Sequence, residues 1–340
     1  MTSNSVAHPV RPGGAPSAGA GPGPSLPRRL ATALLERYAL LLALVVLVAC
    51  FSVMRPDSFF TVANLTSMLG IQAAIGVLAI GVTVVLLVGE FDLSAAAVMG
   101  TSASLMAHLT SVQGHSVAFA VVVVLAGAVL TGAVVAFFVT VVGIHSFIVT
   151  LGMGTLVTGV GLGTAGSTTI GGVPDSLTDT FRAHVLGIEV AFFYMLALAV
   201  VGWVVLQKTP IGRSIFFTGE APAAARLAGI RVQALRAASL IASSVIAALA
   251  GIMLIGQIGA ASPTISSPYL LPAYAAAFLG ATAFTPGRFN VTGTVVAIYL
   301  LAVSTVGFQL LGLSSWITDV FNGAVLVLAV AFSRLVGRGS

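Results

Sequence analysis

Two carboxylates, Glu90 and Asp92, lie in an otherwise apolar part of the chain, the stretch VGEFDLSAAAVMG. An ionisable group at the centre of a bilayer costs about 2.5–3.5 kcal/mol on insertion scales, so each carboxylate needs a physical explanation. Asp92 or Ser94 could cap the helix that follows, because Gly89 permits a tight turn before it. Alternatively, the carboxylates could act directly in gating or in contact with a solute. We expect both near the cytoplasmic surface, where water removes most of the cost.

Other residues that could do chemistry do not form a recognisable site. The five histidines show no ligand spacing with one another or with the single cysteine, Cys50. A phosphate-binding GxxxxGK[ST] loop is absent and the only lysine is Lys208, so the chain cannot hydrolyse ATP through that device. A nucleophile elbow or a catalytic pair of carboxylates is also missing. The sequence therefore predicts no catalytic residue, no metal and no cofactor.

The amino-acid composition indicates which kind of secondary structure must position these residues. Hydrophobic residues make up 58% of the 340 and charged residues 7%, whereas soluble domains carry about a quarter charged residues. The sequence predicts an all-α, polytopic membrane protein of about ten transmembrane helices, since a barrel would alternate polar and apolar residues. The net charge of +5 does not indicate nucleic acid, because the basic residues cluster beside the spans. The expected spans are 38–54, 66–88, 94–112, 117–142, 146–166, 189–206, 237–257, 269–285, 291–311 and 316–333.

The loops between the spans set the expected domains and orientation. Residues 1–30 are rich in Pro, Gly, Ala and Ser, which predicts a disordered cytoplasmic arm before a transmembrane domain at 31–340. Six spans separate this arm from the basic loop at 207–236, so both fall on the cytoplasmic side with the C-terminus. The longest outer connection, Ser167–Gly187, could contact something outside the membrane or could be a solvated loop.

The polar segment Thr209–Val232 interrupts the apolar spans and predicts a short helix outside the bilayer. Ala221 can be its N-cap, Pro222 fits the first helical position, and Gly229 fits just past the end. A helix of small residues presented to the cytosol suits a docking surface for a second protein.

Three stretches resemble the permease subunits of bacterial ribose-type sugar ABC importers, in the branched-chain amino acid/ribose permease superfamily. They are GEFDLS at 89–94, FIVTLGMGTLVTGVGL at 147–162 and TPIGRSIFFTGEAPAAARLAGIRV at 209–232. The resemblance implies a type II importer permease in the bacterial inner membrane, paired with a second permease copy or paralogue. It also implies ABC ATPase subunits docked on the cytoplasmic loop and an extracytoplasmic substrate-binding protein that delivers a monosaccharide.

The resemblance also assigns residues. The ATPase-coupling loop comprises Gly219, Glu220, Pro222, Ala224, Ala225, Arg226, Leu227, Gly229 and Ile230. The signature turn comprises Gly89, Glu90, Asp92, Leu93 and Ser94.

A sugar-sized solute would contact hydroxyl, amide and aromatic side chains along its path, although the same side chains suit hydrogen bonds between helices. The candidates are Gln72, Thr83, Thr150, Gln257, Tyr274 and Gln309. Other functions stay open at this point. The solute could be a nucleoside, a branched-chain amino acid or a furanosyl signal. The chain could also be an ion-coupled secondary transporter that uses Glu90 and Asp92, or a purely structural membrane protein.

Overall fold

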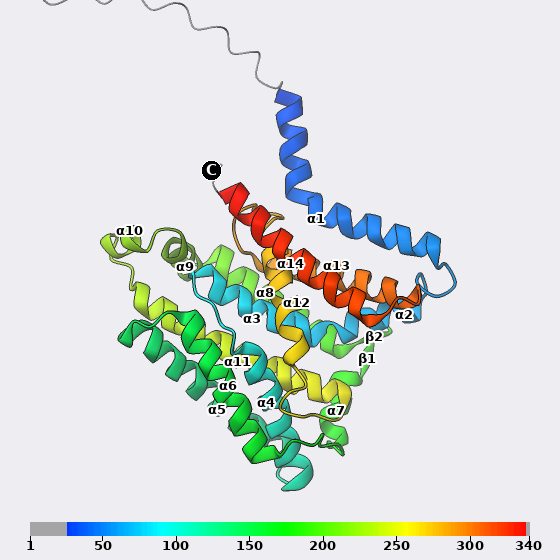
Figure 1. Cartoon of the computed structure of the whole chain (residues 1–340), viewed down its shortest axis with the longest axis vertical. Coiled ribbons are helices and arrows are strands. Elements are labelled where there is room, and N and C mark those ends of the chain that lie inside the picture. The colour runs from blue at the N-terminus through cyan, green and yellow to red at the C-terminus, as the bar shows by residue number, and fades with distance from the viewer. Residues whose placement is uncertain (1–25, 338–340) are drawn as a thin grey trace, which may run out of the picture. The chain divides into compact units, whose positions relative to one another are not determined.

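The computed structural model describes residues 26–337, with side chains described from Tyr38 to Ala331 (Figure 1). Of the predicted arm at 1–30, residues 1–25 lie outside the described part. The helices of ten or more residues are α1 (Leu26–Met54), α2 (Val62–Ile71), α3 (Ala73–Leu87), α4 (Ala95–Ala107), α5 (Val117–Phe137), α6 (Ser146–Ala165), α8 (Val190–Lys208), α9 (Pro210–Glu220), α11 (Val232–Ile258), α12 (Leu270–Gly280), α13 (Val291–Leu310) and α14 (Ser315–Gly337). The expected all-α architecture is confirmed.

The shorter elements occupy turns and connections. They are the helices α7 (Asp175–Arg182) and α10 (Pro222–Leu227), the strands β1 (His184–Val185) and β2 (Ile188–Glu189), the π-helical turns η1 (His108–Val112) and η2 (Phe138–Val142), and the 3₁₀ turn η3 (Ser267–Tyr269). The two strands pair antiparallel as a hairpin. Helices α7 and α9 and this hairpin were not expected from the sequence, because they are short and lie in polar connections.

Each of the ten predicted spans overlaps a helix, but the exact count of ten is not confirmed. Among the described residues, five helices are long and apolar enough to cross a membrane: α5, α6, α8, α11 and α13. A sixth span results if α2 and α3, bent by 41° at Gln72, are counted together. Residues 38–54 and 315–331 form shorter apolar helices.

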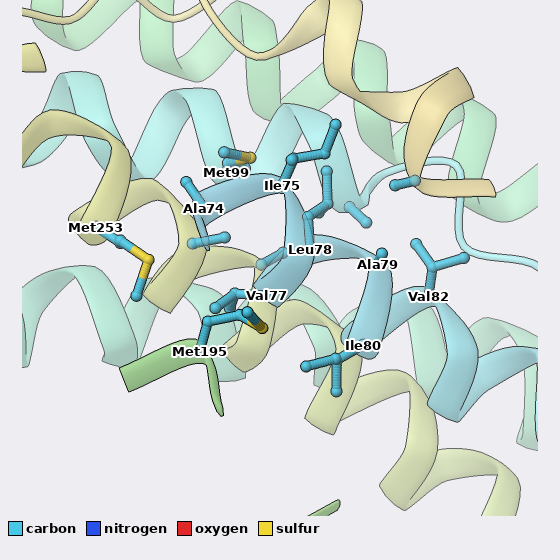
Figure 2. Close-up of a cluster of buried hydrophobic side chains, with 14 of the residues drawn as sticks. Ala74, Ile75, Val77, Leu78, Ala79, Ile80, Val82, Met99, Met195 and Met253 are labelled. Atoms are coloured by element: carbon cyan, nitrogen blue, oxygen red, sulfur yellow. The ribbon is translucent and has the colours of Figure 1, made fainter. Parts of the chain in front are cut away.

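Helix α3 lies at the centre of the fold. Fourteen of its fifteen residues are buried, as expected for a helix that is apolar on every face. Figure 2 shows its side chains against Met99 of α4, Met195 of α8 and Met253 of α11. Helix α11 packs along α3, α4 and α5. The outer helices α5, α6 and α8 are strongly apolar, yet fewer than a third of their positions are buried, which suits contact with hydrocarbon.

Helix α8 connects two ends of the fold that carry polar residues. The hairpin of β1 and β2 comes directly before α8, and α9 and α10 follow it. Because α8 has 19 residues, it spans about 28 Å. The hairpin and α10 therefore lie near opposite ends of this helix (Figure 1).

Candidate functional site

The turn Gly89–Ser94 joins α3 to α4 and is held by side chains of α6. The backbone N–H of Phe91 donates to Ser146 Oγ at 3.1 Å, and that of Leu93 donates to Thr150 Oγ1 at 3.1 Å. A buried backbone N–H is costly to leave without a partner. The residues between two helices therefore keep one conformation because two hydroxyl groups of a third helix satisfy their backbone.

Asp92 connects the same turn to α11 and α12. Its backbone N–H donates to the Tyr274 hydroxyl at 2.9 Å. Its carboxylate accepts from the Ser94 N–H at 3.0 Å, from Ser94 Oγ and from Ser243 Oγ at 2.7 Å. Of the two candidates for capping α4, Asp92 accepts from backbone at the start of the helix, whereas the Ser94 hydroxyl makes no capping bond and donates to Asp92 instead.

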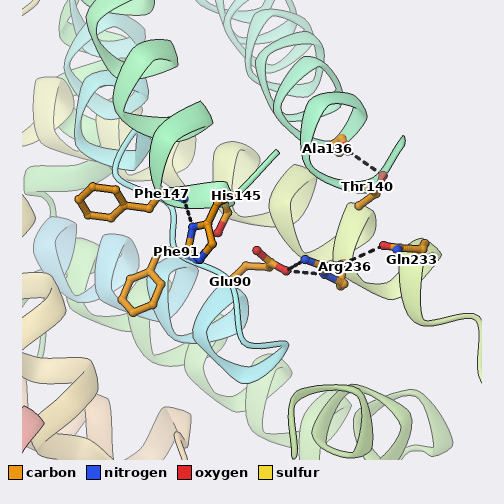
Figure 3. Close-up of polar contacts among 9 residues, drawn as sticks. Glu90, Phe91, Ala136, Thr140, His145, Phe147, Gln233 and Arg236 are labelled. Atoms are coloured by element: carbon orange, nitrogen blue, oxygen red, sulfur yellow. Dashed lines mark hydrogen bonds and ion pairs between the residues drawn. The ribbon is translucent and has the colours of Figure 1, made fainter. Parts of the chain in front are cut away.

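Glu90 forms an ion pair with Arg236, near the start of α11 (Figure 3). Arg236 Nη1 also donates to Gln233 Oε1 at 3.2 Å. We expected water near the cytoplasmic surface to remove most of the cost of these two charges, and this expectation is wrong, because the residues Glu90 and Asp92 are only 4% and 1% exposed. Their burial is compensated by specific partners, a guanidinium for Glu90 and hydroxyl and N–H donors for Asp92.

Helix α9 approaches the end of α3 closely. A Cβ atom at Gly219 would overlap the carbonyl oxygen of Leu87, so only glycine fits between the two backbones. At the same end, Glu220 forms an ion pair of 2.6 Å with Arg288, from the connection between α12 and α13. The predicted coupling loop therefore contacts both the signature turn and a second loop of the same end.

The predicted short helix in this loop is confirmed as α10. Ala221 is its N-cap, Pro222 is its first residue, and Gly229 follows its end with φ +78°. Ala224, Arg226 and Leu227 are exposed, and Leu227 is 92% exposed. Ala225 is fully buried. Six of the nine predicted coupling residues are exposed, whereas Gly219 and Ile230 are partly buried. The exposed six are Glu220, Pro222, Ala224, Arg226, Leu227 and Gly229.

The predicted path residues separate into different places. Thr150 and Tyr274 lie at the 89–94 turn as described above. Thr83 of α3 is fully buried and shares a hydrogen bond of 2.9 Å with Thr294 of α13. Gln309 is exposed near the end of α13. The structure therefore does not bring these residues together in one site.

Gln72 and Gln257 both lie at the bend between α2 and α3. Gln72 ends α2 and precedes α3, and the side chain of Gln257 donates to the carbonyl oxygen of Gly70 at 2.8 Å and to Glu189 at 3.1 Å. The Tyr299 hydroxyl donates to the carbonyl oxygen of Leu69 at 3.0 Å. These bonds satisfy carbonyl groups that a broken span leaves free.

Sequence reasoning missed Arg236, Ser146, Ser243 and Glu189 as members of these clusters. Arg236 was counted only as a basic residue beside a span, and serines in apolar helices are too common to single out two of them. Glu189 directly precedes an apolar run, which is the one local signal that could have drawn attention to it. Within the region of described side chains, no three His, Cys, Asp or Glu residues come close enough to hold a metal ion.

Comparison with known proteins identifies relatives along nearly the whole chain. The ribose import permease protein of Haemophilus influenzae is 31% identical over 301 residues, which cover 87% of this chain and 92% of the relative. The corresponding protein of Bacillus subtilis is 32% identical over 302 residues, covering 88% and 93%. The D-allose transport system permease protein of Escherichia coli is 28% identical over 306 residues, covering 89% and 93%. No solved structure matches the chain.

The family described as the permease component of branched-chain amino acid transport systems matches residues 64–330. Its members are the permease subunits of ABC importers, in which a separate subunit hydrolyses ATP, and this decides against the ion-coupled alternative. The chain therefore belongs to this family of membrane-spanning, non-enzymatic permease components.

Proposed function

We propose that this chain translocates a monosaccharide, delivered by an external binding protein, through a pathway formed with a second permease. The relatives named for ribose and D-allose import support a sugar as the solute. Other relatives are named for autoinducer 2 import. A nucleoside, a branched-chain amino acid and a furanosyl signal remain the alternatives for the transport assay to separate.

The contact between α9 and the end of α3 is the observation that carries the coupling part of this proposal. ATPase subunits dock on the exposed residues of α10, where Leu227 offers an apolar contact and Arg226 a charge. Force on α10 reaches α3 in two ways, through Gly219 against Leu87 and through Arg236 against Glu90. The first contact ends at the last residue of α3 and the second ends in the 89–94 turn that follows it. This turn is also bonded to α6 and α12.

This arrangement suits alternating access. The backbone N–H groups of this turn donate to side-chain hydroxyl groups. Each N–H can move from one hydroxyl acceptor to another at little cost in free energy, because a new hydrogen bond replaces the one that is broken. The 89–94 turn then moves as a unit between α6, α11 and α12 when ATP binds and is released. Discontinuous spans such as α2 and α3 are common at the solute pathways of transporters, and Gln72 and Gln257 at this bend remain our candidates for contact with sugar hydroxyl groups.

The proposed orientation has both termini and α10 in the cytoplasm. The ion pair between Glu220 and Arg288 supports a common side for the 207–236 loop and the connection between α12 and α13. Basic residues are favoured in cytoplasmic loops, and Arg213, Arg226 and Arg231 all lie on this side and are exposed.

Purification from the native membrane tests the proposed function. The tagged chain, extracted in mild detergent, should co-purify with an ATPase subunit that mass spectrometry identifies, together with an external binding protein. Scintillation proximity assays with labelled ribose, allose, leucine and adenosine should then show binding of a sugar by that binding protein. A chain that emerges alone, under conditions that keep another ABC importer of the same membrane intact, would contradict the proposal.

A further inference from the structure

The hairpin between α7 and α8 exposes an apolar residue in a strained conformation. His184 pairs with Glu189 and Val185 with Ile188, which leaves a two-residue turn of Leu186 and Gly187. Both turn residues have positive φ, 55° and 79°. Turns of this geometry favour Asn-Gly, because positive φ is unfavourable for a bulky side chain. Leu186 is nevertheless 92% exposed, so neither backbone geometry nor burial explains a leucine here.

The base of the hairpin is firmly attached to the helical bundle. The N–H of Val190 donates to the carbonyl oxygen of Ala183 at 2.8 Å, and Arg182 Nε donates to the carbonyl oxygen of Gln257 at 2.7 Å. The ring of Phe181 lies so close to Gly256 that a Cβ atom there would overlap it. The tip is thus presented on a rigid support, and a preorganised contact loses less entropy when it binds a partner.

The surroundings of the tip resemble the centre of a protein interface. Val185 is half-exposed beside Leu186, and the residue before them, His184, is polar and exposed. An apolar centre with a polar rim is the general plan of a protein interface. Strain kept at an exposed position points to function, since selection for stability alone would remove it.

The hairpin also continues into the interior. Glu189, at its second strand, accepts from Gln257, which in turn donates to Gly70 at the bend between α2 and α3. A partner bound at the tip would therefore act on a discontinuous span through two side chains.

We propose that Leu186, with Val185 beside it, is the apolar anchor on which the external solute-binding protein docks. This rests on the proposed function, because the hairpin lies at the opposite end of α8 from α10, where the ATPase subunits dock. A docking partner at this end is extracytoplasmic, and in such an importer the partner on that side is the binding protein.

The variant Leu186→Asn tests the anchor without weakening the hairpin. Asparagine is favoured at positive φ, so the variant should keep or raise thermal stability. The matched control is Leu227→Asn, which makes the same substitution at an equally exposed leucine of α10. The wild-type complex and both variants are reconstituted in nanodiscs with the ATPase subunits and the purified binding protein identified by co-purification.

Leu186→Asn should weaken binding of the sugar-loaded binding protein roughly tenfold or more and leave ATPase binding unchanged. Leu227→Asn should weaken ATPase binding and leave the affinity for the binding protein unchanged. Unchanged binding-protein affinity in Leu186→Asn would overturn the anchor, and this is also the result expected if lipid head groups cover the tip. If that occurs in a complex that still holds its ATPase subunits, the proposed function stands. Absence of ATPase subunits from the wild-type complex would overturn both.

Discussion

The carboxylate of Glu90 and the guanidinium of Arg236 form an ion pair across 146 residues of sequence. Glu90 belongs to the turn between α3 and α4, and Arg236 lies one turn into the helix that follows α10. The pair therefore joins the 89–94 turn, where α3, α4, α6, α11 and α12 come together, to the loop where we expect ATPase subunits to dock. It is one of two such links, and the second is the contact of Gly219 with Leu87.

Removing either charge should uncouple ATP hydrolysis from transport. Glu90→Gln or Arg236→Gln leaves the other charge poorly compensated and should lower the free energy of unfolding by about 3 kcal/mol. This value is at the low end for a broken buried ion pair, because a quarter of the Arg236 side chain is exposed. The ratio of sugar taken up to ATP hydrolysed should fall, as measured in proteoliposomes.

The exchange of both residues, Glu90→Arg with Arg236→Glu, is the control for this pair. It should recover part of the coupling that each single reversal loses. A pair that only supports folding would lower uptake and hydrolysis together and leave their ratio at the wild-type value.

A methyl group at position 219 should separate α9 from α3. Gly219→Ala should reduce coupling because the added Cβ overlaps Leu87 O. Gly152→Ala is the matched control, since nothing lies within 4 Å of the Cβ position at Gly152. In a helix, the control substitution stabilises by roughly 0.5–1 kcal/mol. Equal uptake and equal thermal stability in the two variants would show that the close approach has no functional role.

Neighbouring alanines of α10 should respond differently to charge. Ala224 is exposed, so Ala224→Arg should weaken ATPase binding and leave folding intact. Ala225 is fully buried, so Ala225→Glu should destabilise the loop by several kcal/mol, on the order of the penalty for an unpaired buried charge. Fluorescence-detected size exclusion after heating measures the stability, and co-purification measures the ATPase. Loss of folding in Ala224→Arg would contradict the exposed position.

The Tyr274 hydroxyl should stabilise the 89–94 turn. Tyr274→Phe leaves the N–H of Asp92 without its acceptor, which should cost about 1–3 kcal/mol. Tyr194→Phe, at an exposed tyrosine of α8, should change thermal stability by much less. If both variants unfold at the wild-type temperature, water or another group must satisfy the Asp92 N–H.

The long helices and α10 could be predicted from the sequence, because long apolar runs and the Ala221-Pro222 helix start are local signals. Helices α7 and α9 and the hairpin could not be predicted from it. The last depends on a Leu-Gly turn in a conformation that sequence preference assigns to Asn-Gly.

The site was predictable only in part. Local sequence offered Asp92 or Ser94 as a cap for the helix that follows, and the structure shows Asp92 accepting from the backbone N–H of Ser94. The signature turn itself was assigned by resemblance and stays a prediction. The partner of Glu90 could not be read from local sequence, since their separation of 146 residues is fixed by packing of α11 beside α3. Thr150 and Tyr274 were candidates for a solute path or for hydrogen bonds between helices, and the structure shows both bonded to the backbone of the signature turn. Contact of either residue with a solute remains a prediction.

The most direct test of monosaccharide import is uptake by proteoliposomes that contain the purified complex and its binding protein. We predict accumulation of labelled ribose or allose that requires the binding protein outside, and ATP on the α10 side of the membrane. Uptake of leucine in place of either sugar, or sugar uptake driven by an ion gradient without the ATPase subunits, would contradict the account.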